Sequence, residues 1–482
     1  MLNQSNLIST NIEKYLKEHE NKEILRFITC GSVDDGKSTL IGRLLYDSKM
    51  IFEDQLSAIE KDSKKHGTTG DKIDLALLVD GLASEREQGI TIDVAYRFFS
   101  TDKRKFIIAD TPGHEQYTRN MATGASTADL AIILIDARQG VLTQTKRHSY
   151  IVSLLGIKNI VVAINKMDLV DFSQDVFNQI KSDYEKVVPN LPNCKDLSIR
   201  YIPISALNGD NIVTISSKCS WYKDESLMEI LNNIEIYSKD SSSFRFPVQY
   251  VIRPHLNFRG FSGTIVSGEI CVGDEIIVLP SRKTSKVKSI VSNGIKDLRP
   301  KQKDEAVETI EKAFSPMATT ITLEDEIDVS RGDMIVKSSD IPQVSSRVFA
   351  MIVWMSEAPM KLGQNYIIKR ATSVVNGVFE EIGFKKNINS FEEESVQILE
   401  LNDIAKCTIV LDREIAIDSY YENRYTGSFI IIDKYTNNTL GAGMILTPAP
   451  SISKKIKEYT KAEIELNKYI RENFPEWECK AI

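Results

Sequence analysis

Residues 31–38 read Gly31-Ser32-Val33-Asp34-Asp35-Gly36-Lys37-Ser38, which fits the pattern G-x-x-x-x-G-K-[ST]. An apolar run at residues 24–30 precedes this stretch, and a helix-forming run at residues 38–46 follows it. A strand, a glycine-rich turn and a helix in this order build a phosphate-binding loop, because glycines let backbone N–H groups turn inward and approach an anion. The alternative is a chance glycine-rich turn, and the flanking strand and helix argue against it.

The polar residues of this stretch have separate tasks in such a loop. Lys37 places a positive charge near the β- and γ-phosphates of a triphosphate, and the Ser38 hydroxyl is placed to bind Mg²⁺. The helix that starts at Lys37 points its positive end at the same place. We therefore predict a nucleotide-binding loop made of Gly31, Ser32, Val33, Asp34, Asp35, Gly36, Lys37, Ser38 and Thr39.

A second motif, Asp110-Thr111-Pro112-Gly113-His114, directly follows an apolar run at residues 105–109. A carboxylate at the end of a buried strand, opposite the phosphate loop, holds Mg²⁺ through water, and this is the role predicted for Asp110. Gly113 offers a backbone N–H to the γ-phosphate, and His114 stands where a side chain orients an attacking water. The alternatives are an ordinary turn after a strand and a histidine on a surface loop.

A third motif, Asn165-Lys166-Met167-Asp168, ends the apolar run at residues 160–164 and is suited to select a base. Asp168 accepts hydrogen bonds from guanine N1–H and from the 2-amino group, and adenine lacks both donors. Asn165 is predicted to reach guanine N7, and the stem of Lys166 to cover the ring. Because charge-assisted hydrogen bonds contribute about 1.5–3 kcal/mol each, the motif predicts a strong preference for guanine. A polar turn that caps the strand is the alternative.

Two weaker segments complete the predicted site. Ser205-Ala206-Leu207 follows an apolar run at residues 201–204, where a backbone N–H is expected to contact the guanine carbonyl oxygen. Thr91 precedes a predicted strand at residues 92–99 and is assigned as the second hydroxyl ligand of Mg²⁺; the alternative is a β-branched strand residue. The predicted metal ligands are Ser38, Thr91 and Asp110, and the predicted catalytic residues are His114, Lys37 and Thr91. The predicted ligands are GTP and Mg²⁺.

These motifs resemble those of the translational-type GTPases, and within them the GTPase subunits of bacterial sulfate adenylyltransferases. The resemblance is carried by residues 31–48, 77–82, 85–99, 109–126 and 246–254. Elongation factors usually have His at the positions of Ser32 and Asp35, so these two residues favour the sulfate-activating branch.

The resemblance implies an α/β P-loop GTPase domain with a doubly wound, mostly parallel sheet, followed by two antiparallel β-barrel domains. It also implies a reaction in which GTP hydrolysis, with a water near His114, is coupled to the formation of adenylylsulfate and diphosphate from ATP and sulfate. In this family the adenylyl transfer belongs to a separate, smaller catalytic subunit. The implied assembly is a heterodimer or a larger complex.

The sequence pattern divides the chain at a polar run, residues 238–243. Before it, apolar strands alternate with amphipathic helices, which is typical of a parallel sheet. After it, short alternating strands are separated by glycine turns, which is typical of small barrels. The predicted units are a lead-in helix at 1–22, a GTP-binding domain at 23–240, barrels at 244–340 and 344–450, and a helical tail at 451–482.

Composition narrows the function further. The 482 residues carry a net charge of −7, and the sequence pI is about 5.6, so we expect no nucleic-acid partner, which would favour a basic face. No pair of its six cysteines forms a C-x-x-C motif, and no apolar run reaches 18 residues. We expect a cytoplasmic protein without a membrane partner. The rival functions are a translation-elongation-type GTPase that delivers aminoacyl-tRNA to the ribosome, and a free-standing regulatory GTPase.

Overall fold

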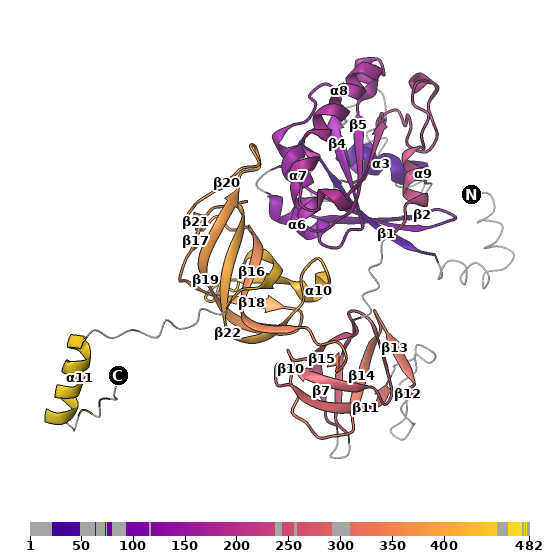
Figure 1. Ribbon diagram of the computed structural model, residues 1–482. Coiled ribbons are helices and arrows are strands. Elements are labelled where there is room, and N and C mark those ends of the chain that lie inside the picture. The colour runs from indigo at the N-terminus through magenta and orange to yellow at the C-terminus, as the bar shows by residue number, and fades with distance from the viewer. Residues whose placement is uncertain are drawn as a thin grey trace.

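The protein is described by a computed structural model, in which three β-rich domains follow one another along the chain (Figure 1). The structure describes residues 22–48, 63, 73, 75–79, 93–114, 117–236, 243–254, 258–291, 309–450, 461–474, 477 and 479. The predicted lead-in helix, apart from residue 22, and the predicted ligand Thr91 lie outside the described residues. Among the described residues, no helix combines the length and the apolar character needed to cross a membrane.

The first domain is built on a six-stranded sheet with the order β2-β3-β1-β4-β5-β6. Five strands run parallel, and β2 is antiparallel to its neighbour β3. Every residue of β4 and β5 is buried, which explains why both read as continuous apolar runs. The strands are β1 (Ile24–Cys30), β2 (Ala95–Ser100), β3 (Lys105–Asp110), β4 (Leu130–Asp136), β5 (Asn159–Asn165) and β6 (Ser198–Pro203).

Helices cover both faces of this sheet, as a doubly wound fold requires (Figure 1). One apolar core packs α6, α7 and α8 against one face, and a second core packs α3 and α9 against the other. These helices are α3 (Lys37–Asp47), α6 (Thr118–Ala125), α7 (Thr143–Leu154), α8 (Gln174–Glu185) and α9 (Leu227–Asn233). Short 3-10 helices are η1 (Leu75–Leu78), η3 (Met167–Val170), η4 (Val188–Asn190), η5 (Cys194–Asp196) and η6 (Ser217–Cys219).

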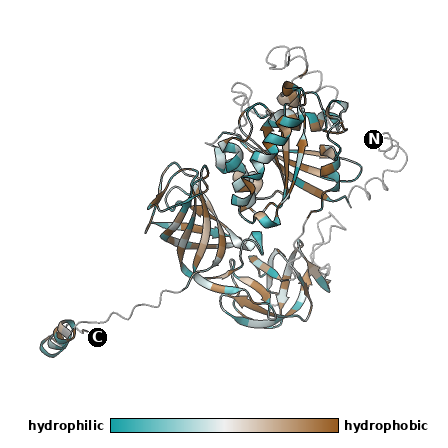
Figure 2. Cartoon of the chain, turned by 45° about the horizontal axis from the view of Figure 1, so that its top comes forward, coloured by the Kyte–Doolittle hydropathy of each residue, from teal (hydrophilic) through white to brown (hydrophobic). Residues whose placement is uncertain are grey.

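Two antiparallel β-barrels follow, each closed by six strands. Apolar residues are concentrated on the strands of the barrels and of the parallel sheet (Figure 2). In the first barrel the pairing of β10 with β11 closes the ring. Its strands are β7 (Arg245–Ile252), β8 (Gly260–Thr264), β10 (Glu275–Leu279), β11 (Lys283–Val291), β14 (Ala318–Leu323) and β15 (Met334–Lys337), with β9 (Glu269–Cys271), β12 (Thr309–Ile310) and β13 (Lys312–Phe314) beside them.

In the second barrel the pairing of β18 with β19 closes the ring. Its strands are β16 (Gln343–Trp354), β18 (Asn365–Arg370), β19 (Ser373–Lys386), β22 (Ile404–Ile417), β23 (Ser428–Ile432) and β24 (Thr439–Pro448), with β17 (Met360–Lys361), β20 (Glu393–Glu394) and β21 (Ile398–Leu399) beside them. The described helices of this part of the chain are α10 (Arg424–Gly427) and α11 (Lys461–Asn473). The predicted fold class, a GTPase-type α/β domain followed by two barrels, is thus confirmed.

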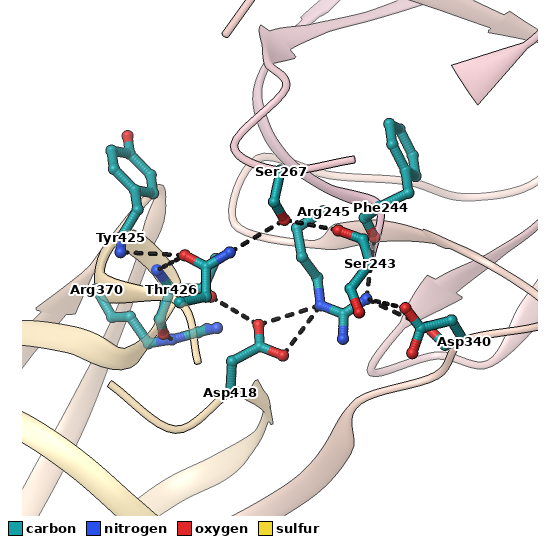
Figure 3. A network of polar contacts seen from close by, with 10 residues as sticks. Ser243, Phe244, Arg245, Ser267, Asp340, Arg370, Asp418, Tyr425 and Thr426 are labelled. Atoms are coloured by element: carbon teal, nitrogen blue, oxygen red, sulfur yellow. Dashed lines mark hydrogen bonds and ion pairs between the residues drawn. The ribbon is translucent and has the colours of Figure 1, made fainter. Parts of the chain in front are cut away.

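A buried ion pair joins the two barrels (Figure 3). Arg245 of the first barrel donates from Nε to both carboxylate oxygens of Asp418, at 3.0 and 3.1 Å. The two side chains are only 5% and 7% exposed. Asp418 also accepts from Thr426 Oγ1 at 2.6 Å, so its charge is shared between a guanidinium and a hydroxyl.

Asp418 begins a segment, residues 418–427, that contacts all three domains; we call it the junction segment. Asn423 donates to Ser267 Oγ of the first barrel at 3.1 Å. Tyr420 donates to the Leu155 carbonyl of the first domain at 3.1 Å. Arg424 donates to the Ala128 carbonyl at 3.3 Å and also to the Gly156 carbonyl. The junction segment therefore supplies polar contacts between the barrels and the first domain, beside an apolar core in which second-barrel residues such as Met351 and Ile404 pack against that domain.

We predict that Asp418→Ala destabilises the pair of barrels by about 3 kcal/mol, because it removes the buried partner of Arg245 and leaves the guanidinium with only the more exposed carboxylate of Asp340, 3.5 Å away. Denaturant unfolding followed by tryptophan fluorescence measures this. The control is Asp328→Ala, which removes an ion pair with Lys283 whose Asp328 side chain is 87% exposed, and which should leave the transition almost unchanged. Equal shifts for both variants would contradict the prediction.

Candidate functional site

The predicted phosphate loop connects β1 to α3, and its shape depends on a left-handed glycine. Gly36, the residue before α3, has φ 89°. A Cβ atom at this position would lie 2.5 Å from Nδ2 of Asn165. No other residue type fits this position, because both the dihedral angle and the space exclude a side chain. The glycine pattern read from the sequence therefore has a specific steric cause.

Lys37 lies beneath this loop and is buried. Its Nζ donates to the Ser32 carbonyl at 2.7 Å and to the Gly31 carbonyl at 3.2 Å. Burial lowers the pKa of Lys37, while the charges of Asp35 and Asp110 raise it. The ammonium group is thus held inside the curve of the loop, close to two carboxylates.

Asp35 closes the loop on itself. Its carboxylate accepts the Ser32 backbone N–H at 2.5 Å. Burial raises the pKa of Asp35, and the charge of Lys37 and the Ser32 hydrogen bond oppose that rise. The sequence assigned Asp35 to nucleotide binding as part of the loop. In this structure its side chain holds the loop's own backbone.

The segment that begins with Asp110 lies directly against the phosphate loop. Asp110 ends β3 opposite Thr29 of β1, and its side chain is buried. A Cβ atom at Gly113 would lie 2.4 Å from Lys37 Nζ and 2.9 Å from the Gly31 carbonyl oxygen. Because Gly113 has no side chain, its backbone approaches Lys37 more closely than the backbone of another residue type could at this position. Ser38, which is half-buried, and the buried Asp110 carry oxygen atoms of the kind that Mg²⁺ prefers.

His114 follows Gly113 and is exposed. Its ring lies edge-on to the ring of Tyr117, with 6.1 Å between the centroids. The structure thus places this histidine at the surface beside the phosphate loop. The catalytic role assigned to it from the sequence stays a prediction.

Asn165 connects the parts of the site. Its Nδ2 donates to the Asp35 carbonyl at 2.8 Å, and its Oδ1 accepts from the Ala206 backbone N–H at 2.9 Å. The side chain is almost completely buried. It therefore ties the phosphate loop to the segment 205–207. The predicted contact of Asn165 with guanine N7 is untested, and the bracing role is one that the sequence did not indicate.

The remaining guanine-motif residues surround the same place. Lys166 adopts φ 61°, and Asp168 is half-buried in η3. Arg43 of α3 donates from Nε to the Ala206 carbonyl at 3.2 Å and also to the Leu207 carbonyl. The structure therefore brings together the phosphate loop, the motif at 165–168 and the segment 205–207, which are far apart in the sequence. Thr91 alone among the predicted site residues lies outside the described residues.

Four residues of this region were not identified from the sequence: Arg43, Asp136, Arg138 and His148. His148 of α7 accepts the Gly31 backbone N–H on Nδ1 at 3.1 Å. Burial lowers the pKa of His148 to about 3, so the ring is neutral at ordinary pH and able to accept. Asp136 ends an apolar strand, as Asp110 and Asn165 do, and this signal was available; no pattern in the sequence indicated His148.

Comparisons with known proteins agree with this geometry. Residues 22–236 match the family described as "Elongation factor Tu GTP binding domain", and residues 347–446 match "GTP-eEF1A C-terminal domain-like". Among solved structures, the chain is similar to Sup35 complexed with GDP, with a TM-score of 0.39 and 21% identity over 89% of this chain and 95% of the other. That likeness is too low to support a functional comparison.

Similarity to curated proteins is much higher. The chain is 60% identical to sulfate adenylyltransferase subunit 1 of Sulfurovum sp. (strain NBC37-1) and 61% identical to that of Aliarcobacter butzleri (strain RM4018). Each alignment covers 100% of both chains. The protein of Saccharophagus degradans with the same name is 58% identical over 100% of this chain and 99% of its own. With its GTP-binding domain and two barrels, the chain belongs to the sulfate adenylyltransferase subunit 1 family of GTPase-type enzyme subunits.

Proposed function

We propose that this chain binds GTP with Mg²⁺ and hydrolyses it as the regulatory subunit of a sulfate adenylyltransferase. The observation that carries the proposal is the double hydrogen bond of Asn165, which holds the phosphate loop and the segment 205–207 on opposite sides of one side chain. The loop proposed to bind phosphates and the segment proposed to contact the base are thereby linked through one side chain. The family membership supports the same conclusion.

In the proposed complex, different residues of the chain bind different parts of the nucleotide. The backbone of residues 31–36 and Lys37 hold the phosphates, and Asp168 reads the base. Ser38, Asp110 and Thr91 would hold Mg²⁺, which supplies neutralisation of the phosphate charge. His114, exposed next to Gly113, orients the attacking water.

We propose further that hydrolysis drives adenylyl transfer on a smaller catalytic subunit. Formation of adenylylsulfate and diphosphate from ATP and sulfate is uphill, so coupling it to GTP hydrolysis is thermodynamically reasonable. The designation of the relatives as "subunit 1" supports the existence of a second subunit. We place the complex, a heterodimer or a larger assembly, in the cytoplasm and in sulfate assimilation. An elongation-type function on the ribosome is the alternative that the following experiment addresses.

The coupling is tested by measuring adenylylsulfate formation with the co-purified small subunit, ATP and sulfate. GTP should raise the product level, and GDP or a non-hydrolysable GTP analogue should not. Lys37→Ala, which removes the buried ammonium from the phosphate loop, should abolish the effect of GTP. Adenylylsulfate formation that does not depend on GTP, together with GTP hydrolysis that ribosomes stimulate, would favour the elongation-type alternative instead.

Asp168→Asn should change the base preference from guanine towards xanthine, because an amide donates to the xanthine 2-oxygen where the carboxylate accepted from the guanine 2-amino group. Titration with fluorescent GDP and xanthosine diphosphate measures the two affinities. Asp171→Asn serves as the control, since Asp171 is an exposed carboxylate three residues further along the chain and asparagine tolerates its left-handed φ of 50°. A variant at Asp168 that still prefers guanine contradicts the assignment.

His114→Ala should slow single-turnover GTP hydrolysis by about 100-fold, as expected for loss of a group that handles the attacking water. The dissociation constant for GTP should change little, because the proposed role concerns the water and not the nucleotide. Thr123→Ala, an exposed position on the nearby helix α6, is the control and should leave both quantities unchanged. If GTP affinity fell in parallel with the rate, His114 would be a binding residue.

A further inference from the structure

A buried carboxylate that the proposed mechanism does not use lies beside the guanine motif. Asp136 is the last residue of β4, and its side chain is 0% exposed. In the parallel sheet its register partner is Asn165 of β5. The Ala137 backbone N–H donates to the Asn165 carbonyl at 2.9 Å, which fixes this neighbourhood. The topology of the sheet therefore places the carboxylate of Asp136 near the residues that would read the base.

Asp136 is shared by two cations. Lys166 Nζ lies 3.0 Å from its Oδ2. Arg138 donates from Nη2 to the same oxygen at 2.6 Å, and from Nε to Oδ1 at 3.0 Å. Burial alone would raise the pKa of Asp136, but the hydrogen bonds from Arg138 and Lys166 outweigh it and bring the pKa to about 2. The carboxylate is therefore charged at any ordinary pH and holds both cations.

Asp168 lies close to the same two cations, Lys166 along the chain and Arg138 through its charge. Lys166 stands two residues before it in a tight left-handed turn with φ 61°. The pKa of Arg138 is raised chiefly by its hydrogen bond to Asp136 and by the charge of Asp136, and to a smaller extent by the charge of Asp168. Two positive and two negative side chains thus share one small region.

We propose that Asp136 is a positioning residue for guanine recognition, which engages Lys166 and Arg138 and so keeps both cations off the carboxylate of Asp168. This inference rests on the proposed binding of GTP. An amide at position 136 has a single acceptor oxygen and no charge, so it holds the two cations much less strongly than the carboxylate does. Released cations would pair with Asp168 and compete with the N1–H and 2-amino donors of guanine, because a charge-assisted hydrogen bond is about twice as strong as a neutral one.

The test is a double-mutant cycle on the full chain, with Asp136→Asn introduced into the native sequence and into Asp168→Asn. In the native sequence Asp136→Asn should weaken GTP and GDP binding about equally, by about tenfold, because the loss concerns the base and not the phosphates. In the Asp168→Asn background it should change xanthosine triphosphate binding by less than about threefold, since no carboxylate remains there for the cations. Fluorescent nucleotide titration gives all six affinities.

The control is Glu225→Gln, which removes a half-exposed ion pair with Arg200 in the same domain. It should alter no affinity. A further combination, Asp136→Asn with Arg138→Gln, should regain part of the lost GTP affinity, because one of the two competing cations is gone. If the single variant does not fold by circular dichroism, this charge-balanced double variant takes its place in the cycle, with the same expected contrast between GTP and xanthosine triphosphate.

The outcomes separate the two proposals. Failure of the native chain to bind GTP would overturn the proposed function itself. Native binding with an unchanged affinity in Asp136→Asn would overturn only the positioning role. Equal losses for GTP in the native sequence and for xanthosine triphosphate in Asp168→Asn would also overturn it, because they would mean that Asp136 acts on the structure of the domain and not through Asp168.

Discussion

The hydrogen bonds of one buried amide organise the candidate site. Asn165 donates to the Asp35 carbonyl of the phosphate loop and accepts from the Ala206 backbone N–H. Because both partners are backbone groups, the contact sets the distance between two main-chain segments rather than between flexible side chains. Loss of the amide would leave a buried donor or acceptor unsatisfied, at a cost of about 1–3 kcal/mol. The loop proposed to bind phosphates and the segment proposed to contact the base are in this way joined by one side chain.

The parallel sheet explains why the other candidate residues gather at the same edge. β3, β4 and β5 end at Asp110, Asp136 and Asn165, respectively, and the phosphate loop begins where β1 ends. The carboxyl ends of parallel strands lie on one side of the sheet, where helix N-termini also point. Polar side chains at the ends of apolar strands therefore come together although they lie far apart in the sequence. The helix α7 extends this arrangement. Its His148 accepts the Gly31 backbone N–H of the phosphate loop. Just beyond the helix, the carbonyls of Leu155 and Gly156 accept hydrogen bonds from the junction segment.

Much of this organisation is readable from the sequence, and the exceptions have physical causes. The phosphate loop and the guanine motif are local patterns, so their positions followed from residue spacing, and the fold class followed from the strand and helix pattern together with the family resemblance. The bracing role of Asn165 and the contacts of Arg43, Asp136 and His148 depend on which strands become neighbours, and this is decided by the whole sheet. The same holds for Arg245 and Asp418, which lie far apart in the sequence and pair only because two closed barrels pack together. A sequence motif predicts which residues belong to a site, whereas the arrangement of the strands determines which of these residues face a ligand and which hold one another in place.

The central claim is that the site accepts a guanine nucleotide and rejects an adenine nucleotide. The most direct measurement is isothermal titration of the full chain with GTP and with ATP, each with Mg²⁺ in excess. Binding of GTP should be tighter by a factor of roughly 10⁴, as expected when a carboxylate loses both of its donors on the wrong base. Equal affinity for the two nucleotides would contradict the account.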